Sequence, residues 1–294
     1  MPNVRPLVAG VVVAASAASL AVPALAASAT GAETTSTTTG ERELRVIGLT
    51  ADNRLVRFDT DSPGDTDNIG EVDGLIGDRM LVGIDFRVQD RNLYGVGDKG
   101  GIYTLHRRNA EATRVSQLTA PLDGRRFGVD FNPAADRLRV ISNTGQNLRH
   151  DVNPGGITTV DGTLNYPDVD PVATGVTMAA YTNNDLSAAS STTLFDIDAN
   201  LDQVVAQAPA NAGSLNATGQ LGVDVVQNGG FDIYTEVGDD GRADGLRPYA
   251  TLRVPGESRF KLYDVRLLTG RIELEGAFPA EDRVVDIAMP LNQL

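Results

Sequence analysis

Short runs of alternating hydrophobic and polar residues fill the body of the chain from about Glu41 onward. Runs rich in Val, Ile, Leu, Phe and Tyr are separated by Gly, Asn, Asp and Pro, as in Asp136-Arg137-Leu138-Arg139-Val140. Alternation with a period of two is typical of β-strands, and the separating residues are those that form turns. The longer periodicity of amphipathic helices is missing. The pattern therefore predicts an all-β fold.

One of these runs recurs along the chain with an aspartate near its centre. The copies are Gly83-Ile84-Asp85-Phe86, Gly128-Val129-Asp130-Phe131, the variant Gly175-Val176-Thr177-Met178, Gly222-Val223-Asp224-Val225 and the shortened Val285-Asp286-Ile287. The glycines at 83, 128, 175 and 222 are separated by 45, 47 and 47 residues. So regular a spacing indicates one structural unit repeated along the chain.

A second strand type repeats in the same phase, as in Leu55-Val56-Arg57-Phe58-Asp59, Ile102-Tyr103-Thr104-Leu105 and Leu194-Phe195-Asp196-Ile197-Asp198. A further run lies between the two types, and another follows the second type. Each repeat therefore contains four short strands in about 46 residues, which is the pattern of a β-propeller blade.

The length of the body predicts how many blades the ring holds. Residues 41–294 divide into five units of about 47 if Glu236 to Pro255 contains an insertion of about 20 residues. A six-bladed ring, in which Tyr249 to Val254 belongs to a further blade, is the alternative. The chain begins on a second strand at Leu44–Thr50 and ends on a first-type strand at Arg283–Met289. The C-terminal strand is therefore expected to complete the N-terminal blade and close the ring.

Three segments resemble one known family: the Gly-Ile/Val-Asp-Phe runs, Phe127 to Pro133 with the strand after it, and the early Gly48 to Leu55. They are similar to the exported bacterial family labelled domain of unknown function 4394 (DUF4394), and the resemblance extends from about Leu44 to Met289. It implies an exported, β-rich, propeller-like domain. The family brings no settled activity, so it assigns no catalytic residue.

The N-terminus carries the features of an export signal. Residues 1–26 have an early Arg5, an apolar run, and the small-x-small sequence Ala24-Leu25-Ala26. The apolar part is broken by Ser16, Ser19 and Pro23, whereas a membrane span needs about 20 apolar residues. We expect cleavage near Ala26 and a secreted or extracytoplasmic protein. Residues 27–40 are small and polar, which predicts a flexible leader before a single domain at 41–294.

Charge and cysteine content exclude several classes of function. The chain has a net charge of −14, and loss of residues 1–26 removes one arginine and no acid. An acidic protein of this kind is not expected to bind nucleic acid or an anionic membrane. Cysteine is absent, which excludes disulfides, thiol catalysis and a lipidated cysteine. The C-terminal residues contain neither a hydrophobic tail nor a basic stop. We expect a monomer without a membrane anchor that binds an extracytoplasmic protein or polymer.

The repeated aspartates are the principal candidate site. Period-two alternation places Asp85, Asp130, Asp224 and Asp286 on the face opposite the large apolar residues of each first strand. In one interpretation each carboxylate accepts backbone N–H groups of the next blade, since a buried charge without partners is costly. In the other, a ring of carboxylates holds a cation in the central channel. Because the aspartate recurs in almost every blade, we favour the interpretation in which it accepts backbone N–H groups. Thr177 stands in place of the aspartate in the copy at residues 175–178.

Other acidic segments are weaker metal candidates. Asp240 and Asp244 take positions one and five of a calcium loop, with Gly245 at position six, although Arg242 and Thr251 stand where ligands are expected. Calcium at this loop is therefore a minor alternative, and no cofactor is otherwise expected. The series Asp196, Asp198, Asn200, Asp202 and the run Asp59, Asp61, Asp65, Asp67 are interpreted as turn and loop residues.

Catalytic chemistry finds little support. His106 and His150 are the only histidines, and His150 stands where other repeats have an aromatic residue. Two hypotheses of different class follow. The favoured one is a non-enzymatic binding module whose loops contact a partner. The alternative is a calcium-dependent hydrolase of the esterase or lactonase type, with its site in the axial channel.

Overall fold

Twenty strands form five four-stranded antiparallel sheets in the computed structural model, which describes residues 43–167, 172–183, 185–186, 190–239 and 242–293. Blade 1 contains β20 (Val284–Ala288), β1 (Arg45–Thr50), β2 (Arg54–Asp59) and β3 (Asp67–Glu71). Blade 2 contains β4 (Leu81–Phe86), β5 (Leu93–Gly97), β6 (Gly101–Leu105) and β7 (Ala112–Gln117). Blade 3 contains β8 (Phe127–Asn132), β9 (Arg137–Ser142), β10 (Asn147–His150) and β11 (Thr158–Val160).

The remaining two blades have the same order. Blade 4 contains β12 (Val176–Tyr181), β13 (Leu194–Asp198), β14 (Gln203–Gln207) and β15 (Leu215–Gln220). Blade 5 contains β16 (Gly230–Val237), β17 (Ala243–Leu252), β18 (Lys261–Val265) and β19 (Ile272–Ala277). A single turn of 3-10 helix, Ala210–Ala212, lies between β14 and β15. Nowhere in the described part of the chain is there a helix long and apolar enough to span a membrane.

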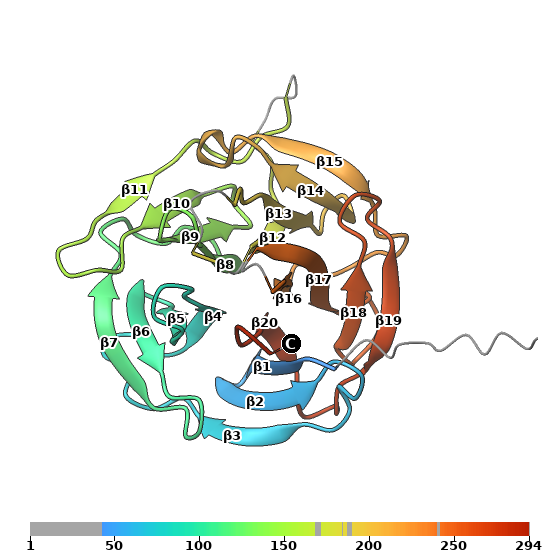
Figure 1. Ribbon diagram of the computed structural model, residues 1–294, viewed down its shortest axis with the longest axis horizontal. Coiled ribbons are helices and arrows are strands. Elements are labelled where there is room, and N and C mark those ends of the chain that lie inside the picture. The colour runs from blue at the N-terminus through green and yellow to red at the C-terminus, as the bar shows by residue number, and fades with distance from the viewer. Residues whose placement is uncertain (1–42, 168–171, 184, 187–189, 240–241, 294) are drawn as a thin grey trace, which may run out of the picture. The chain divides into compact units, whose positions relative to one another are not determined.

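The five sheets form a closed ring, with the first strand of each blade innermost (Figure 1). Each inner strand contacts the inner strand of the next blade, in the order β20, β4, β8, β12, β16 and back to β20. The C-terminal β20 pairs antiparallel with the N-terminal β1, from Ile47 opposite Ala288 to Thr50 opposite Val284. The predicted five-bladed propeller and its closure by the C-terminal strand are confirmed. The predicted signal segment 1–26 and leader 27–40 lie outside the described residues.

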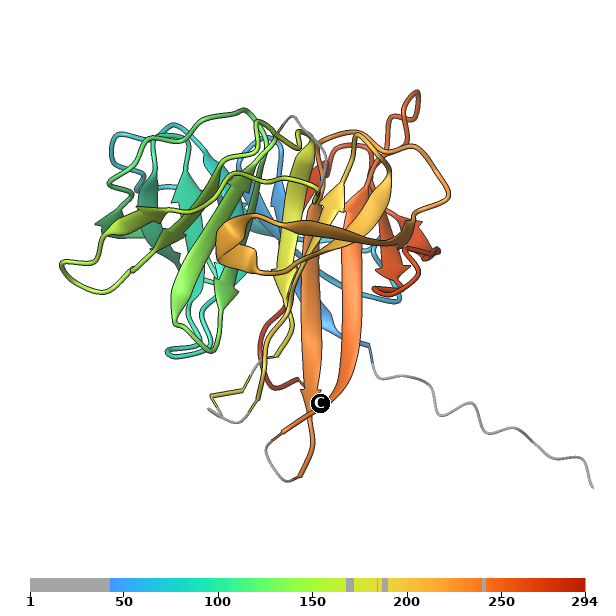
Figure 2. The same cartoon turned by 90° about the horizontal axis from the view of Figure 1, so that it is seen from above.

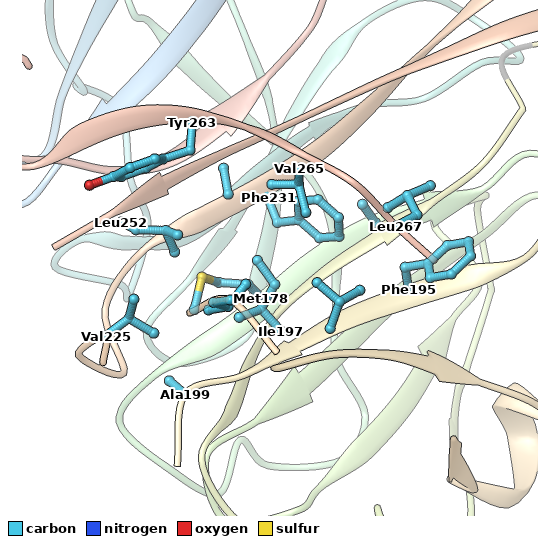
Figure 3. Packing of buried hydrophobic residues seen from close by; sticks show 14 of the residues in the cluster. Met178, Phe195, Ile197, Ala199, Val225, Phe231, Leu252, Tyr263, Val265 and Leu267 are labelled. Carbon is cyan, nitrogen blue, oxygen red and sulfur yellow. The ribbon is translucent and has the colours of Figure 1, made fainter. Parts of the chain in front are cut away.

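The hydrophobic core lies between neighbouring blades. Five clusters of buried apolar residues each draw their members from two adjacent sheets. Figure 3 shows one of them, in which Met178 and Ile197 of blade 4 pack with Phe231, Leu252 and Val265 of blade 5. Because strand side chains alternate, each inner sheet can present apolar residues to both of its neighbours. Burial between blades thus stabilises the ring as a whole, in proportion to the apolar area removed from water.

Glycine allows the inner strands to approach one another closely. A Cβ on Gly128 would lie 2.8 Å from the backbone nitrogen of Ala179 in the next blade. A Cβ on Gly83 would lie 2.4 Å from Cγ2 of Val129. The glycine that opens these two repeats therefore leaves room for the next inner strand.

Blade 5 differs from the arrangement predicted for it. Its inner strand is β16, and Gly222-Val223-Asp224-Val225 lies in the loop before it, so the assignment of those residues to an inner strand was wrong. The described part of Glu236–Pro255 contains no separate insertion, because it holds the end of β16 and the ten residues of β17, the second strand of the blade. Figure 2 shows β16 and β17 as long strands that extend beyond those of the other blades.

Candidate functional site

Two cavities at the centre of the ring are lined by different parts of the inner strands. One cavity is lined by residues at the beginnings of these strands, including Leu81, Phe127 and Val285. Another is lined by residues at or after their ends, including Phe86 and Phe131. We call these the start face and the end face of the ring. The five inner strands therefore run in the same direction around one axis.

A layer of buried carboxylates lies towards the end face, and each carboxylate accepts backbone N–H groups. Asp85 accepts from its neighbour Phe86 at 2.6 Å and from Phe131 of blade 3 at 2.7 Å. Asp130 accepts from Tyr181 of blade 4 at 3.1 Å. These bonds tie each inner strand to the next, since charge-assisted hydrogen bonds are among the stronger ones.

Blade 5 contributes Asp232 in the same manner, whereas Asp286 of blade 1 lies two residues nearer the start of its strand, because Ala288 precedes the Met289 that donates to Asp232. Asp232 accepts from Ile233 and Met289, both at 2.6 Å. Asp286 accepts from Ile84 of blade 2 at 2.7 Å. We call Asp85, Asp130, Asp232 and Asp286 the carboxylate layer. All four side chains are buried, and their hydrogen bonds connect neighbouring blades around most of the ring.

Asp224, expected among the inner-strand carboxylates, is exposed in a loop, and Asp232 takes its place. The sequence contained a signal for it, because Gly230-Phe231-Asp232-Ile233 repeats the glycine, aspartate and apolar pattern eight residues later. Phe131 and Tyr181 are equivalent, because each donates its N–H to the aspartate of the preceding blade. Asp130 precedes Phe131, whereas Ala180 precedes Tyr181. Blade 4 therefore has an alanine at the carboxylate position. Thr177 lies three residues earlier and belongs to the start face.

Burial and mutual repulsion shift the titration of this layer. Burial raises the pKa of Asp85 and Asp130 well above the usual range, and the neighbouring carboxylates raise it further. Burial also raises the pKa of Asp286, against the opposing effect of its backbone hydrogen bonds. For Asp232, burial raises the pKa to about 6. The layer therefore retains protons at mildly acidic pH, as desolvation and like charges predict.

Three members of the layer could converge on a cation. Asp85, Asp130 and Asp232 each offer a carboxylate oxygen, and these oxygens lie within 4.8 Å of one another. The adjoining cavity has a volume of about 10 Å³, the size needed for a single water molecule or ion. Both oxygens of Asp85 and Asp232 already accept backbone N–H groups. These oxygens therefore serve to hold neighbouring blades together by hydrogen bonds.

The start face holds a larger cavity with a different lining. Its volume is about 280 Å³, and all five inner strands or the segments just before them contribute. Three arginines line it, Arg125 and Arg126 before β8 and Arg283 before β20. The amides Gln227 and Asn228, the hydroxyl of Thr177 and the ring of Phe127 complete the polar and aromatic lining. We call this cavity the arginine pocket.

The guanidinium groups of the three arginines and the hydroxyl of Thr177 have no side-chain partner among the described residues. Within the described ranges, none of the three guanidinium groups has an acidic partner; that of Arg126 donates only to the carbonyl oxygen of Arg125. Thr177 is 1% exposed, and its Oγ1 makes no hydrogen bond. A buried hydroxyl without a partner costs about 1–3 kcal/mol. Groups that lack partners around one cavity are suited to binding a ligand.

The other predicted sites remain outside the channel. Asp240 lies outside the described residues, and Asp244 is exposed on β17. Asp198 accepts the backbone N–H groups of Asn200 and Leu201, which is turn chemistry. Asp67 pairs with Arg57 at 2.9 Å on the surface.

His150 contacts a hydroxyl on each side of its ring. Its Nε2 lies 2.8 Å from Ser116 Oγ, and its Nδ1 lies 3.0 Å from Thr158 Oγ1. A serine triad requires an acid where Thr158 stands. Burial lowers the pKa of His150, so the ring stays neutral. The contact therefore joins blades 2 and 3 by hydrogen bonds.

The class of protein defined by this architecture is the five-bladed β-propeller. The chain belongs to the family described as Domain of unknown function (DUF4394), which matches residues 54–288. No curated protein matches the chain.

Solved structures that resemble the chain include the nidogen/laminin complex, at 12% identity and a TM-score of 0.45, covering 85% of this chain and 86% of that one. Another is a protein of unknown function from Bacteroides thetaiotaomicron VPI-5482, at 13% identity and a TM-score of 0.44, covering 85% and 67%.

Proposed function

We propose that this protein is an exported, non-enzymatic binding module that takes an anionic group of an extracytoplasmic ligand into the arginine pocket. The observation that carries the proposal is the gathering of Arg125, Arg126 and Arg283 at one cavity, without acidic partners in the described ranges. The chain as a whole has a net charge of −14, so this local positive charge runs against its composition.

The chemistry of the pocket supports recognition of an oxyanion. Guanidinium groups form two parallel hydrogen bonds with a carboxylate or phosphate, and they keep their charge at any physiological pH. Concave sites with a few convergent polar groups and an apolar lining are the usual form of a ligand site. The volume of about 280 Å³ suits a small ligand, or the terminal group of a larger one.

Residues Ala24 to Ala26 support the extracytoplasmic location, since a cleavable signal requires the apolar run and small-x-small sequence found there. The partner is an extracytoplasmic polymer or protein that carries acidic groups, and the protein acts as a monomer. N-terminal sequencing of the secreted protein would test export: a mature chain beginning near residue 27 is expected, whereas one beginning at Met1 would contradict it.

Calorimetric titration with citrate and inorganic phosphate tests anion binding. We expect binding that weakens as salt is added, because exposed charges are screened. Arg126→Gln and Arg283→Gln should each weaken binding about tenfold or more, since a hydrogen bond to a charged group is worth about 1.5–3 kcal/mol.

The matched control is Arg108→Gln. Arg108 is an exposed arginine in the turn between β6 and β7, outside the pocket, and its replacement should leave the affinity unchanged. Absence of binding by both anions, or equal losses in all three variants, would refute the proposed function.

A further inference from the structure

The arginine pocket contains more than a charged rim, and this bears on which anion it takes. A single inorganic oxyanion requires only converging N–H donors. The lining also includes the half-buried Phe127 and the apolar residues Val82 and Val285. The pocket therefore has room and apolar surface for a carbon skeleton attached to the anionic group.

Thr177 provides a second, independent observation. Thr177 is 1% exposed and belongs to the lining of the pocket, and its Oγ1 is buried without a hydrogen-bond partner. A hydroxyl both donates and accepts, so the group that satisfies it best is another hydroxyl. Gln227 donates its amide to Asn200 at 2.6 Å, which leaves its carbonyl oxygen as an acceptor beside the pocket. Asn228 adds a further amide to the lining.

These groups together match the chemistry of an acidic sugar. Resting on the proposed function, we infer that the arginine pocket binds a carboxylated pyranose, that is, a uronate residue of an acidic polysaccharide. Its carboxylate pairs with the arginines. One apolar C–H face of its ring covers Phe127, whose π-face carries partial negative charge. Its hydroxyls bond to Thr177 and to the amides of Gln227 and Asn228. The carboxylate supplies affinity, and the hydroxyls supply selectivity, because a site with buried polar groups rejects ligands that leave them unpaired.

The test is calorimetric titration of the mature protein with galacturonate, glucuronate and their short oligomers. Galactose and glucose serve as neutral counterparts, and acetate and inorganic phosphate serve as anions without a sugar ring. We expect at least one uronate to bind tenfold or more tighter than acetate, phosphate and the neutral sugars.

Two variants separate the sugar contacts from the charge. Thr177→Val, which keeps the shape of the side chain, should weaken uronate binding about tenfold and affect phosphate much less. Gln227→Ala should act in the same direction, and it provides the readout if Thr177→Val unfolds, as judged by circular dichroism. Arg126→Gln should weaken uronate and phosphate alike.

The outcomes distinguish the two proposals. Equal affinity for acetate, phosphate and the uronates would overturn the uronate assignment but leave an anion site in place. Binding of neutral sugars as tightly as uronates would also overturn it, by removing the role of the arginines. Binding of none of these ligands would refute both proposals.

Discussion

At the scale of single residues, the carboxylates of the inner strands combine two physical demands that conflict. As hydrogen-bond acceptors they must lie at the axis, where Asp85 and Asp232 each receive two N–H groups. As charges they are then buried close to one another, which raises their pKa. Asp196 shows the same effect, opposed only by the charge of Arg139 and not by hydrogen bonds. Burial raises its pKa well above the usual range, and neither of its oxygens has a hydrogen-bond partner.

We predict that the free energy of unfolding falls as the pH rises from 5 to 8. The pKa of Asp232 is about 6 in the folded protein, against an ordinary value of 3.8. A raised pKa means that its stabilising contribution is complete below about pH 3.8 and is lost as the pH passes through about 6. The total loss from this group is about 3 kcal/mol, and about half of it falls above pH 5, because the loss begins near pH 3.8. Asp85, Asp130, Asp196 and Asp286 act in the same direction.

Carboxylates with a lowered pKa do not oppose this trend within the same window, whereas His150, whose pKa burial lowers from 6.5, opposes it below about pH 6.5. Arginine partners lower the pKa of Asp52 and Asp136, so their contribution is lost only below about pH 3.8. Urea unfolding at pH 5, 6, 7 and 8 measures the slope. Asp232→Asn should cost about 1–3 kcal/mol at pH 5, because one N–H loses its acceptor, and should flatten the slope. An unchanged slope would show that Asp232 does not titrate in this range.

At the scale of the strand, the sequence predicted the features that recur in every blade and missed those that are particular to blade 5. The recurring glycine and aspartate sufficed for the number of blades and for the closure by β20, because every blade solves the same packing problem. Blade 5 was misaligned because Gly222-Val223-Asp224-Val225 imitates an inner strand at the expected spacing. The true copy at Gly230–Ile233 is recognised only by burial, since Asp232 is buried and Asp224 is exposed.

The arginine pocket could not be predicted from any local motif. Arg126 and Arg283 are 157 positions apart in the chain, and only the closed ring brings them to one cavity. One signal was available, because Arg125-Arg126 and Arg283 each stand immediately before an inner strand. Given a propeller, residues at that position must meet at the start face.

Closure of the ring gives a prediction at the same scale. Ending the chain after Asp282 removes β20, which exposes the edge of β1 and takes Val284, Ile287 and Met289 out of an inter-blade core. We expect the shortened protein to aggregate or to lose its cooperative unfolding transition, because an unpaired edge and an open core face remain. A synthetic peptide of residues 281–294 should restore the transition by strand addition, and a scrambled peptide should not.

Circular dichroism during thermal unfolding provides the measurement for this prediction. A shortened protein with the transition midpoint of the full chain would show that β20 is dispensable, and that blade 1 is stable with three strands.

At the scale of the whole molecule, the two faces of the ring carry side chains of opposite charge near the axis. Arg125, Arg126 and Arg283 line the start face from the segments just before two inner strands, and carboxylates of the inner strands lie towards the end face. A propeller achieves this because each inner strand contributes one residue at each depth of the channel. Charges of one sign therefore accumulate in a layer, and an acidic chain can form a local site for anions.

The carboxylate layer allows a last prediction, on divalent cations. If Asp85, Asp130 and Asp232 serve chiefly as acceptors for backbone N–H groups, calcium and chelator should leave the melting temperature of the mature protein unchanged. A cation that binds only the folded state would raise stability by RT ln(1 + [L]/Kd), about 2.7 kcal/mol at a hundredfold excess over Kd. Scanning calorimetry with calcium and then with chelator measures this. An increase of several degrees that Asp130→Asn abolishes would identify the layer as a cation site, and it would restore the calcium-dependent hydrolase as a hypothesis.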